Sequence, residues 1–192
     1  MIIYLAGISC VGKTTIGRML AKKMGFSFFD VDEEVEKYYQ KPIERIQDEC
    51  FTIYGFREKA SVVIDNILSN TDNTVISGTP AGLKYSFLQV YKKHKKKMEI
   101  VSIHIKDTPE NILSRLTFFD KDSKPIEEYL DESKKKRYLR KITADYNYFK
   151  DSYERADLQI DIKDISLENI PNLIIRRLKE MNECCAKQLL TK

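Results

Sequence analysis

The chain has 192 residues, a formal net charge of +4, and 42% hydrophobic and 32% charged side chains. Its length predicts one domain with a sizeable buried core, and its composition is typical of a soluble globular protein. The small positive charge suits anionic ligands but falls well short of the basic excess of nucleic-acid-binding proteins. The basic runs 92–97 and 134–137 also lack interleaved aromatic residues that could stack on bases, so we expect no nucleic-acid partner.

Short apolar runs alternate along the chain with stretches whose apolar residues recur at helical spacing. The predicted strands are 2–6, 26–30, 74–77, 100–105 and 158–162. The predicted helices are 14–24, 51–69, 83–93, 109–117 and the tail 167–190. Strands that alternate with helices predict an α/β fold of three layers, in which helices cover both faces of a parallel sheet.

Two segments depart from this alternation. Residues 32–48 carry short amphipathic helices in place of one crossover helix, and residues 118–136 are polar and rich in loop-forming side chains. The first segment is therefore predicted to be a helical insertion and the second a mobile excursion.

The four cysteines have neither the paired spacing of zinc sites nor that of a secreted disulfide framework, which indicates reduced thiols in a cytosolic protein. Cys184 and Cys185 are interpreted as packing residues of the tail helix, with a redox role as the alternative. The first apolar run is too short to cross a membrane, and no export signal is visible. We expect a cytoplasmic monomer with no membrane partner.

The segment Gly7-Ile8-Ser9-Cys10-Val11-Gly12-Lys13-Thr14 matches the phosphate-binding loop pattern G-x-x-x-x-G-K-[ST] at every fixed position. The glycines allow a tight turn in which backbone N–H groups converge on phosphates, at the positive end of the following helix. In this pattern Lys13 reaches the β- and γ-phosphates and the Thr14 hydroxyl binds Mg²⁺. A chance match is the alternative, and the strand before and the helix after the loop argue against it. The predicted ATP-binding residues here are Gly7, Cys10, Val11, Gly12, Lys13, Thr14 and Thr15.

Phosphoryl transfer also needs a group that orients the attacking hydroxyl and cations that balance the developing charge. Asp30 and Asp32 end the second predicted strand, where ligands bind in open α/β sheets, although they would also suit a solvated helix start. Arg57 begins a long helix. Arg115 and Lys124 flank the polar segment, as the cations of a lid would. For each of these three residues, simple surface exposure is the alternative.

Together these motifs resemble the shikimate kinase family, whose fold is related to that of the nucleoside monophosphate kinases. The matching segments are 12–21 (loop and first helix), 29–32 (Asp-x-Asp), 56–57 (Phe-Arg) and 124–126 (lid motif, with lysine in place of arginine). The resemblance implies an ATP- and Mg²⁺-dependent kinase that phosphorylates a hydroxyl of shikimate, in aromatic amino acid biosynthesis.

The same resemblance implies a role for each matching residue. Asp30 would join Thr14 at the metal, while Asp32 would bind the substrate and orient or deprotonate its hydroxyl. Arg57 would bind the substrate carboxylate, and Arg115 would lie on the adenine side. Lys124 would move onto the transferring group as the lid closes and excludes water.

The substrate half departs from the family pattern. The sequence of residues 77–82 is Ser-Gly-Thr-Pro-Ala-Gly, where the family has a triple-glycine loop. Tyr148 stands where a second carboxylate-binding arginine is expected, and a tyrosine offers one hydrogen bond instead of a bidentate charge pair. Arg140 and Lys141 are candidates to replace that arginine. Gly78 and Tyr148 remain predicted substrate-binding residues.

We therefore predict one P-loop kinase domain over residues 1–192, with a substrate-binding insertion at about 32–60 and a lid at about 118–136. Its predicted activity is ATP-dependent phosphorylation of a small metabolite such as shikimate. Two alternatives remain open: a divergent family member that phosphorylates another small hydroxy acid or a nucleotide, and a nucleotide-binding regulator without catalysis. The presence of both Lys13 and Asp32 favours an enzyme.

Overall fold

The structure, a computed structural model, describes residues 1–190 and the side chains of residues 1–183. Its central feature is a five-stranded parallel sheet with the strand order β2-β3-β1-β4-β7. The three-layer α/β fold predicted from the alternation is confirmed, and each predicted strand agrees with an observed one to within one residue. The strands are β1 (Ile2–Ala6), β2 (Ser27–Asp30), β3 (Thr74–Ser77), β4 (Ile100–Lys106) and β7 (Leu158–Asp161).

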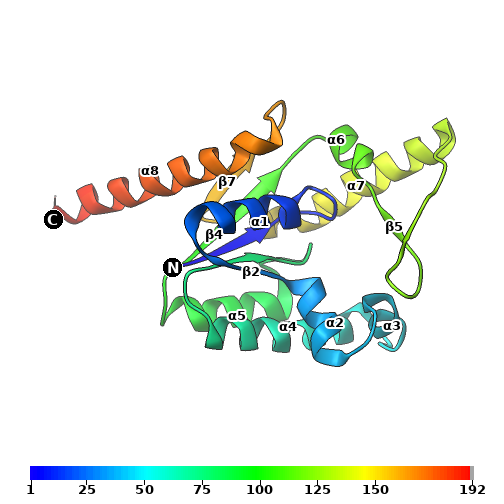
Figure 1. The fold of residues 1–192 in the computed structure, drawn as a ribbon, viewed down its shortest axis with the longest axis horizontal. Helices are drawn as coiled ribbons and strands as arrows, with labels where there is room; N and C mark the ends of the chain where they lie inside the picture. The colour runs from blue at the N-terminus through cyan, green and yellow to red at the C-terminus, as the bar shows by residue number, and fades with distance from the viewer. Residues whose placement is uncertain (191–192) are drawn as a thin grey trace.

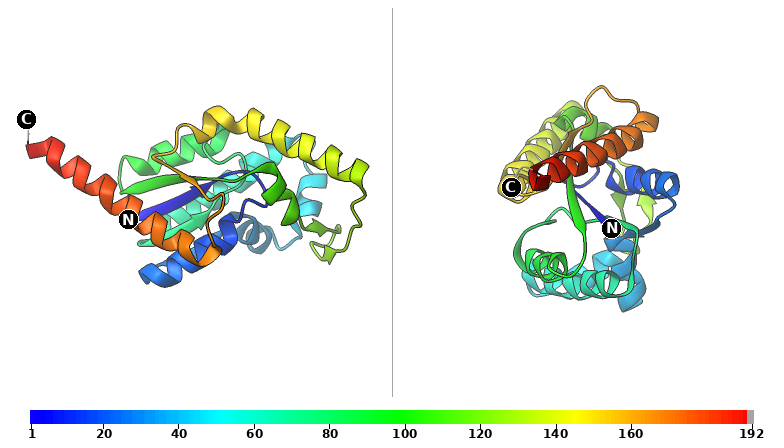
Figure 2. Two further views of the ribbon diagram at one scale, coloured as in Figure 1. Left: turned by 90° about the horizontal axis from the view of Figure 1, so that it is seen from above. Right: turned by 90° about the vertical axis from the view of Figure 1, so that its left-hand side faces the viewer.

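Helices cover both faces of this sheet (Figures 1 and 2): α1 and α8 lie on one face, and α4, α5 and α7 on the other. The strand order explains this division. The connection from β1 to β2 runs toward one edge and the later connections run the opposite way, so right-handed crossovers place their helices on opposite faces. The helices are α1 (Lys13–Met24), α2 (Val31–Tyr39), α3 (Ile43–Asp48), α4 (Ile53–Asn70), α5 (Tyr85–Lys95), α6 (Pro109–Ser114), α7 (Glu132–Tyr153) and α8 (Ile170–Leu190), with a 3-10 turn at Leu167–Asn169.

The central strands are buried because they carry apolar side chains on both faces. All five residues of β1 are buried, and Val75, Ile76 and Ile103 in the strands beside it are fully enclosed. Burial of one such side chain contributes about 1.5–3 kcal/mol, so these strands form a rigid platform. Their carboxyl ends meet at one edge of the sheet, where the loops after β1, β2 and β3 come together.

The segment between β2 and β3 folds into α2, α3 and α4. Helices α2 and α3 are the short amphipathic helices predicted for residues 32–48. Asp30 caps α2 by accepting a hydrogen bond from the Asp32 N–H. Thr52 caps α4 through the Gly55 N–H, and therefore α4 begins at Ile53, two residues later than predicted.

The polar segment after α6 forms a two-stranded antiparallel hairpin, β5 (Phe118–Phe119) and β6 (Pro125–Ile126), which extends from the body of the molecule toward α2 and α3 (Figure 1). The 22-residue helix α7 follows it, and this helix was not among the predicted ones. Cys184 and Cys185 lie outside the residues whose side chains are described. Within the described part of the chain, no helix is sufficiently long and apolar to span a bilayer.

Candidate active site

The loop between β1 and α1 is folded tightly against β4. Gly7 has a φ of 148°, and a Cβ atom there would lie 2.7 Å from the carbonyl oxygen of Ile105. Glycine is required at this position because any side chain would collide with backbone. Lys13 donates from Nζ to the carbonyl oxygens of Gly7 and Ile8, each at 2.9 Å. Its ammonium therefore lies within the loop, at the positive end of α1.

Three side-chain oxygens meet beside the loop. Thr14 Oγ1 donates to Asp30 Oδ2 at 2.6 Å and lies 3.5 Å from Ser77 Oγ. Asp30 is buried, and its second carboxylate oxygen caps α2. Such a hard oxygen set suits Mg²⁺, which keeps several waters and binds phosphates as well as one or two carboxylates. Among the described residues, no group of three or more His, Cys, Asp or Glu side chains is arranged to hold a metal by itself.

Asp32 occupies the first turn of α2 and contacts both the phosphate side and the acceptor side of the site. Burial and the neighbouring Asp30 raise the pKa of Asp32 to about 6, while the Lys13 ammonium opposes this shift. Burial also lowers the pKa of Lys13, against the attraction of the two carboxylates. A carboxyl group with a pKa close to neutrality is suited to accept a proton in a reaction at physiological pH.

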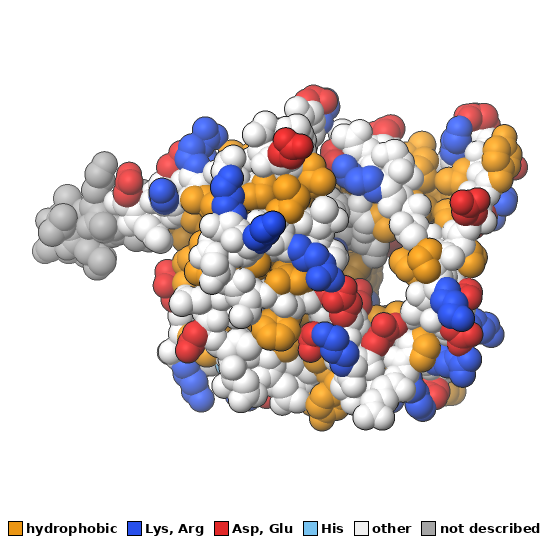
Figure 3. Space-filling model, viewed as in Figure 1, with side chains coloured by type: hydrophobic (Ala, Val, Ile, Leu, Met, Phe, Trp, Pro, Cys, Tyr) orange, Lys and Arg blue, Asp and Glu red, His pale blue; other side chains and the backbone are white. Residues whose placement is uncertain are grey.

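A cleft of about 630 Å³ runs along the loop and separates the body from the hairpin arm in Figure 3. Gly78 lines this cleft, on the phosphate side of the site. Glycine is needed at this position because a Cβ atom would lie 2.5 Å from the Tyr4 ring. The cleft is lined by Ser9, Cys10, Gly12, Lys13, Thr14, Thr15, Asp30, Asp32, Ser77, Gly78, Pro80, Arg115, Thr117 and Phe119.

A second cavity, of about 280 Å³, opens beside Asp32 and is enclosed by α4, α7 and the loop after β3. Sequence reasoning did not single out two of its polar residues, Thr79 and Asp145. Thr79 lies in the loop that stands where the family has its triple glycine, Asp145 belongs to no recognisable motif, and the fold brings the two residues together. The cavity is lined by Ile8, Ser9, Asp32, Gln47, Ile53, Phe56, Arg57, Thr79, Pro80, Ala81, Phe87, Asp145 and Phe149.

Arg57 is the cation of this second cavity. It is only 8% exposed, and its Nη1 has no hydrogen-bond partner among the described residues. Its guanidinium lies over the Tyr85 ring at 4.5 Å and near the Tyr54 ring at 5.6 Å. A buried guanidinium with an N–H that lacks a partner is suited to bind an anion, because burial without a partner is unfavourable.

A third cavity, of about 330 Å³, lies on the other side of the loop between α6 and the segment that follows β7. Arg115 borders it, donates to Asp107 at 2.5 Å and reaches the carbonyl oxygen of Cys10 at 3.4 Å. Val11, Gly12 and Thr15 line the same cavity. Asp107 was not among the predicted site residues, although a carboxylate after a strand end could have been recognised as a partner for Arg115.

The predicted residues Lys124 and Tyr148 lie apart from these cavities. Lys124 is exposed beside the hairpin turn and lines neither the cleft nor the two smaller cavities. The turn contacts the α2–α3 region instead, where Ser123 Oγ donates to Glu36 Oε1 at 2.6 Å. Tyr148 is half exposed, and its hydroxyl lies 2.5 Å from that of Tyr85, the ring that supports Arg57. The roles of Lys124 and Tyr148 stay predictions.

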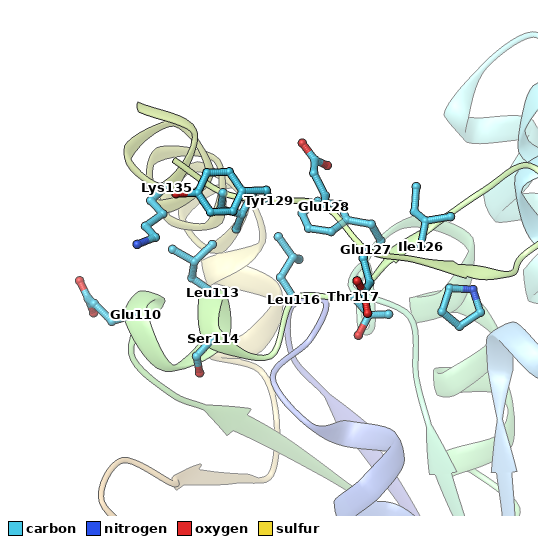
Figure 4. Close-up of a pocket in the computed structure, with 13 residues that line it drawn as sticks. Glu110, Leu113, Ser114, Leu116, Thr117, Ile126, Glu127, Glu128, Tyr129 and Lys135 are labelled. Carbon is cyan, nitrogen blue, oxygen red and sulfur yellow. The ribbon is translucent and has the colours of Figure 1, made fainter. Parts of the chain in front are cut away.

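A further cavity, of about 1000 Å³, lies away from the phosphate loop, between α6 and the segment that joins β6 to α7. Figure 4 shows Leu113 and Leu116 on one side of it and Glu128 and Tyr129 on the other. Carboxylates at its rim make it unsuitable for an anionic nucleotide. It is a gap at the base of the hairpin.

Comparisons with known proteins agree with this geometry. The family model for shikimate kinase matches residues 9–179. A shikimate kinase of Persephonella marina is 30% identical over 178 residues, which cover 92% of this chain and 98% of that protein.

Solved structures show the same fold. The shikimate kinase of Bacteroides thetaiotaomicron superposes with a TM-score of 0.76 at 20% identity, covering 93% of this chain and 98% of that one. The shikimate kinase of Acinetobacter baumannii, solved in complex with shikimate, superposes with a TM-score of 0.72 at 23% identity, covering 93% of each chain. The chain thus belongs to the shikimate kinase family and is an ATP-dependent small-molecule kinase.

Proposed function

We propose that the protein transfers the γ-phosphoryl group of Mg²⁺–ATP to a hydroxyl group of shikimate. The observation that carries this proposal is the cavity shared by Asp32 and Arg57. It joins a carboxyl group suited to proton transfer to a buried guanidinium that is suited to a carboxylate and whose Nη1 has no hydrogen-bond partner among the described residues. A hydroxylated acid such as shikimate has both groups that this cavity would recognise.

On the donor side, the loop N–H groups and Lys13 hold the β- and γ-phosphates, and the adenine lies in the cavity beside Arg115. Thr14 and Asp30 would hold Mg²⁺, for which their closely spaced oxygens are suitable. The bound metal would neutralise charge on the phosphate oxygens. Lys13 stabilises the charge that develops as the γ-phosphoryl group moves.

On the acceptor side, Arg57 binds the carboxylate and so directs the hydroxyl toward Asp32. Asp32 orients this hydroxyl and accepts its proton as the new P–O bond forms, while the bond from the γ-phosphorus to the oxygen shared with the β-phosphate breaks and ADP leaves. The hairpin at 118–126 acts as the lid, with Thr117 and Phe119 already bordering the cleft. Its closure would bring Lys124 toward the phosphates and exclude water from the transferring group.

We further propose that the enzyme works in the cytoplasm as a monomer, without nucleic acid. Cys10 and Cys50 are free thiols, as expected of a reducing compartment. Donor and acceptor cavities also lie within one chain.

A second candidate acceptor, another small hydroxy acid, is favoured by one observation. Thr79 replaces a glycine of the family loop, and its buried Oγ1 has no hydrogen-bond partner among the described residues. An acceptor with an additional polar group could satisfy this hydroxyl.

The test is ADP release from Mg²⁺–ATP, measured with and without shikimate for the wild type and for Asp32→Asn. Turnover that requires shikimate and is lost in the variant supports the proposed acceptor. Absence of a shikimate response, in protein that still binds ATP, contradicts it and favours another hydroxy acid.

A further inference from the structure

The loop between β3 and α5, residues 78–84, forms one wall of the acceptor cavity. Thr79, Pro80 and Ala81 line that cavity, and Pro80 also lines the phosphate cleft. A displacement of the loop would therefore change both the shape of the acceptor cavity and the distance from a bound acceptor to the phosphates. Group transfer is sensitive to displacements of about 1 Å, so the contacts that hold this loop bear on the reaction.

Two successive turns form the backbone of the loop. The Gly82 N–H donates to the carbonyl oxygen of Thr79 at 2.9 Å, and the Lys84 N–H donates to that of Ala81 at 2.8 Å. Pro80 is the second residue of the first turn, where its fixed φ is favourable, but it has no N–H to donate. Its carbonyl oxygen takes part in neither turn and needs a partner from another element.

Helix α7 supplies this partner through two neighbouring side chains. The Tyr153 hydroxyl donates to the carbonyl oxygen of Pro80 at 2.8 Å, and Ser152 Oγ accepts from the Leu83 N–H at 3.2 Å. Both side chains are buried. Burial also raises the pKa of Tyr153, so its hydroxyl keeps its proton and remains a donor. The loop is thus attached to the end of α7 at two points.

The ring of Tyr153 is itself held against the sheet. It stacks on the ring of His104 in β4, with 4.5 Å between the ring centroids and 14° between the planes. Gln159 of β7 donates from Nε2 to the carbonyl oxygen of Tyr153 at 2.8 Å, and its Oε1 lies 2.6 Å from His104 Nδ1. Because the amide nitrogen of Gln159 serves Tyr153, its oxygen accepts from the Nδ1–H of His104. These contacts keep the Tyr153 hydroxyl at a fixed place relative to β4 and β7.

Tyr4 reaches the same loop from β1, but its contact is weaker. Its hydroxyl lies 3.5 Å from the carbonyl oxygen of Gly82, which is long for an O–H···O hydrogen bond, whereas the bond from Tyr153 to Pro80 has an ordinary length of 2.8 Å. Tyr153 therefore makes the shorter of the two tyrosine contacts to the loop, and it makes it at a residue that lines the acceptor cavity.

We propose that Tyr153 is a positioning residue, which holds the loop after β3 in the shape that the acceptor cavity needs. Tyr153 itself lies outside the lining of the cavity and acts through Pro80. The inference rests on the proposed function, in which this cavity takes the acceptor.

The experiment compares wild type with Tyr153→Phe, which removes the hydroxyl and keeps the ring on His104. The control is Tyr91→Phe, which removes another buried tyrosine hydroxyl, one that bonds to Ser102 and Asp157. For Tyr153→Phe we expect KM for shikimate to rise about five- to tenfold, because the Pro80 carbonyl loses its partner and the loop shifts. We expect kcat and KM for ATP to stay within about twofold of wild type, and Tyr91→Phe to leave all three values unchanged.

Amide hydrogen exchange measures the loop without any acceptor. In Tyr153→Phe the amides of Gly82 and Leu83 should exchange about five- to tenfold faster than in wild type, because the loop opens more often. The amide of Val75, which is fully buried in β3, should keep its rate. A general structural role for the hydroxyl would instead accelerate the loop and the strand by the same factor.

An increase in KM for shikimate together with faster exchange restricted to the loop would support the proposal. It would be overturned by an unchanged KM, by unchanged exchange in the loop, by equal acceleration at Val75, or by an equal increase in KM in Tyr91→Phe. In each of these cases shikimate turnover by the wild type would leave the proposed function intact.

If the wild type does not phosphorylate shikimate, the proposed function fails and hydrogen exchange alone decides the inference. Acceleration restricted to the loop in Tyr153→Phe would then still support the positioning role. Unchanged exchange, or acceleration that includes Val75, would overturn it.

Discussion

Asp30 and Asp32 are two residues apart at the end of β2, yet their surroundings give them different tasks. Asp30 is buried and uses both oxygens, one for Thr14 and one for the cap of α2. Asp32 borders both the phosphate cleft and the acceptor cavity, and burial together with the negative charge of Asp30 raises its pKa. The first residue therefore suits a structural and metal-binding role, and the second suits proton transfer.

This difference predicts a pH dependence. A base must be deprotonated to act, so kcat/KM should fall as the pH decreases through the pKa of Asp32, about 6. Asp32→Asn should lower kcat by about 10²–10⁴-fold and remove this acid limb. The measurement is a pH–rate profile of both proteins, with the exposed Asp151→Asn as control. An acid limb that persists in Asp32→Asn would assign it to another group.

Lys13 supplies the charge on the donor side. Lys13→Ala should lower kcat by about 10²-fold or more, because the ammonium that lies within the loop to stabilise the transferring group is lost. Lys22→Ala, which removes an exposed lysine from the last turn of the same helix, should leave the rate unchanged. Comparable turnover in Lys13→Ala and wild type would exclude the loop as the catalytic phosphate site.

At the scale of elements, local signals predicted most of the fold. Continuous apolar runs marked β1 and β3 correctly because both strands are buried on both faces. Helix α7 escaped prediction because most of its residues are polar and exposed, and its buried residues are few: Ile142, Phe149, Ser152 and Tyr153. Its helical form depends on packing that only the complete fold provides.

The site residues also divide into those that local sequence signals identify and those that only the complete fold brings together. The phosphate loop and the Asp-x-Asp pair are contiguous, so sequence was sufficient to find them. The contact between Tyr85 and Tyr148 joins residues 63 positions apart, and nothing in either segment predicts it. Long-range contacts of this kind are set by strand order and helix packing.

The hairpin is attached to the acceptor side by its turn. Ser123 donates to Glu36, and Arg45 pairs with Asp122 at 2.5 Å. Ser123→Ala should weaken this attachment by about 0.5–1.5 kcal/mol and admit water more often. We expect ATP hydrolysis without acceptor to rise about two- to tenfold relative to phosphoryl transfer. The control is Ser133→Ala, at an exposed position of α7. An unaltered ratio of hydrolysis to transfer would mean that this contact does not govern the lid.

Across the whole molecule, one carboxylate connects three elements. Asp157 accepts hydrogen bonds from the backbone and hydroxyl of Ser102 on β4, and from Tyr91 and Lys95 on α5, immediately before β7 begins. This network holds one sheet edge against the helix that follows the acceptor loop. A network with all members satisfied stabilises one arrangement of the elements, and removal of its acceptor leaves buried donors unpaired.

The network also makes stability depend on pH. Burial acts to raise the pKa of Asp157, but hydrogen bonds from Lys95 and Ser102 outweigh it, so the pKa is lowered. A carboxyl group with a lowered pKa in the folded state contributes stability above its unfolded pKa, and this contribution disappears as the pH falls through the folded value. Asp157→Asn should therefore lower the free energy of unfolding by about 1–3 kcal/mol at pH 7 and by progressively less below pH ~4.

Urea unfolding of wild type and Asp157→Asn at several pH values between 7 and 2.5 measures this difference, with Asp151→Asn as a surface control. A gap between the two proteins that narrows toward acid assigns the stabilisation to the charge of Asp157. If the difference in free energy of unfolding stays the same at every pH, the stabilisation comes from shape and packing instead. The amide would then destabilise the protein equally whether the wild-type carboxyl group is protonated or ionised. In that case the connection between β4, α5 and β7 would depend on the geometry of the network, and acid would destabilise the protein at other carboxylates.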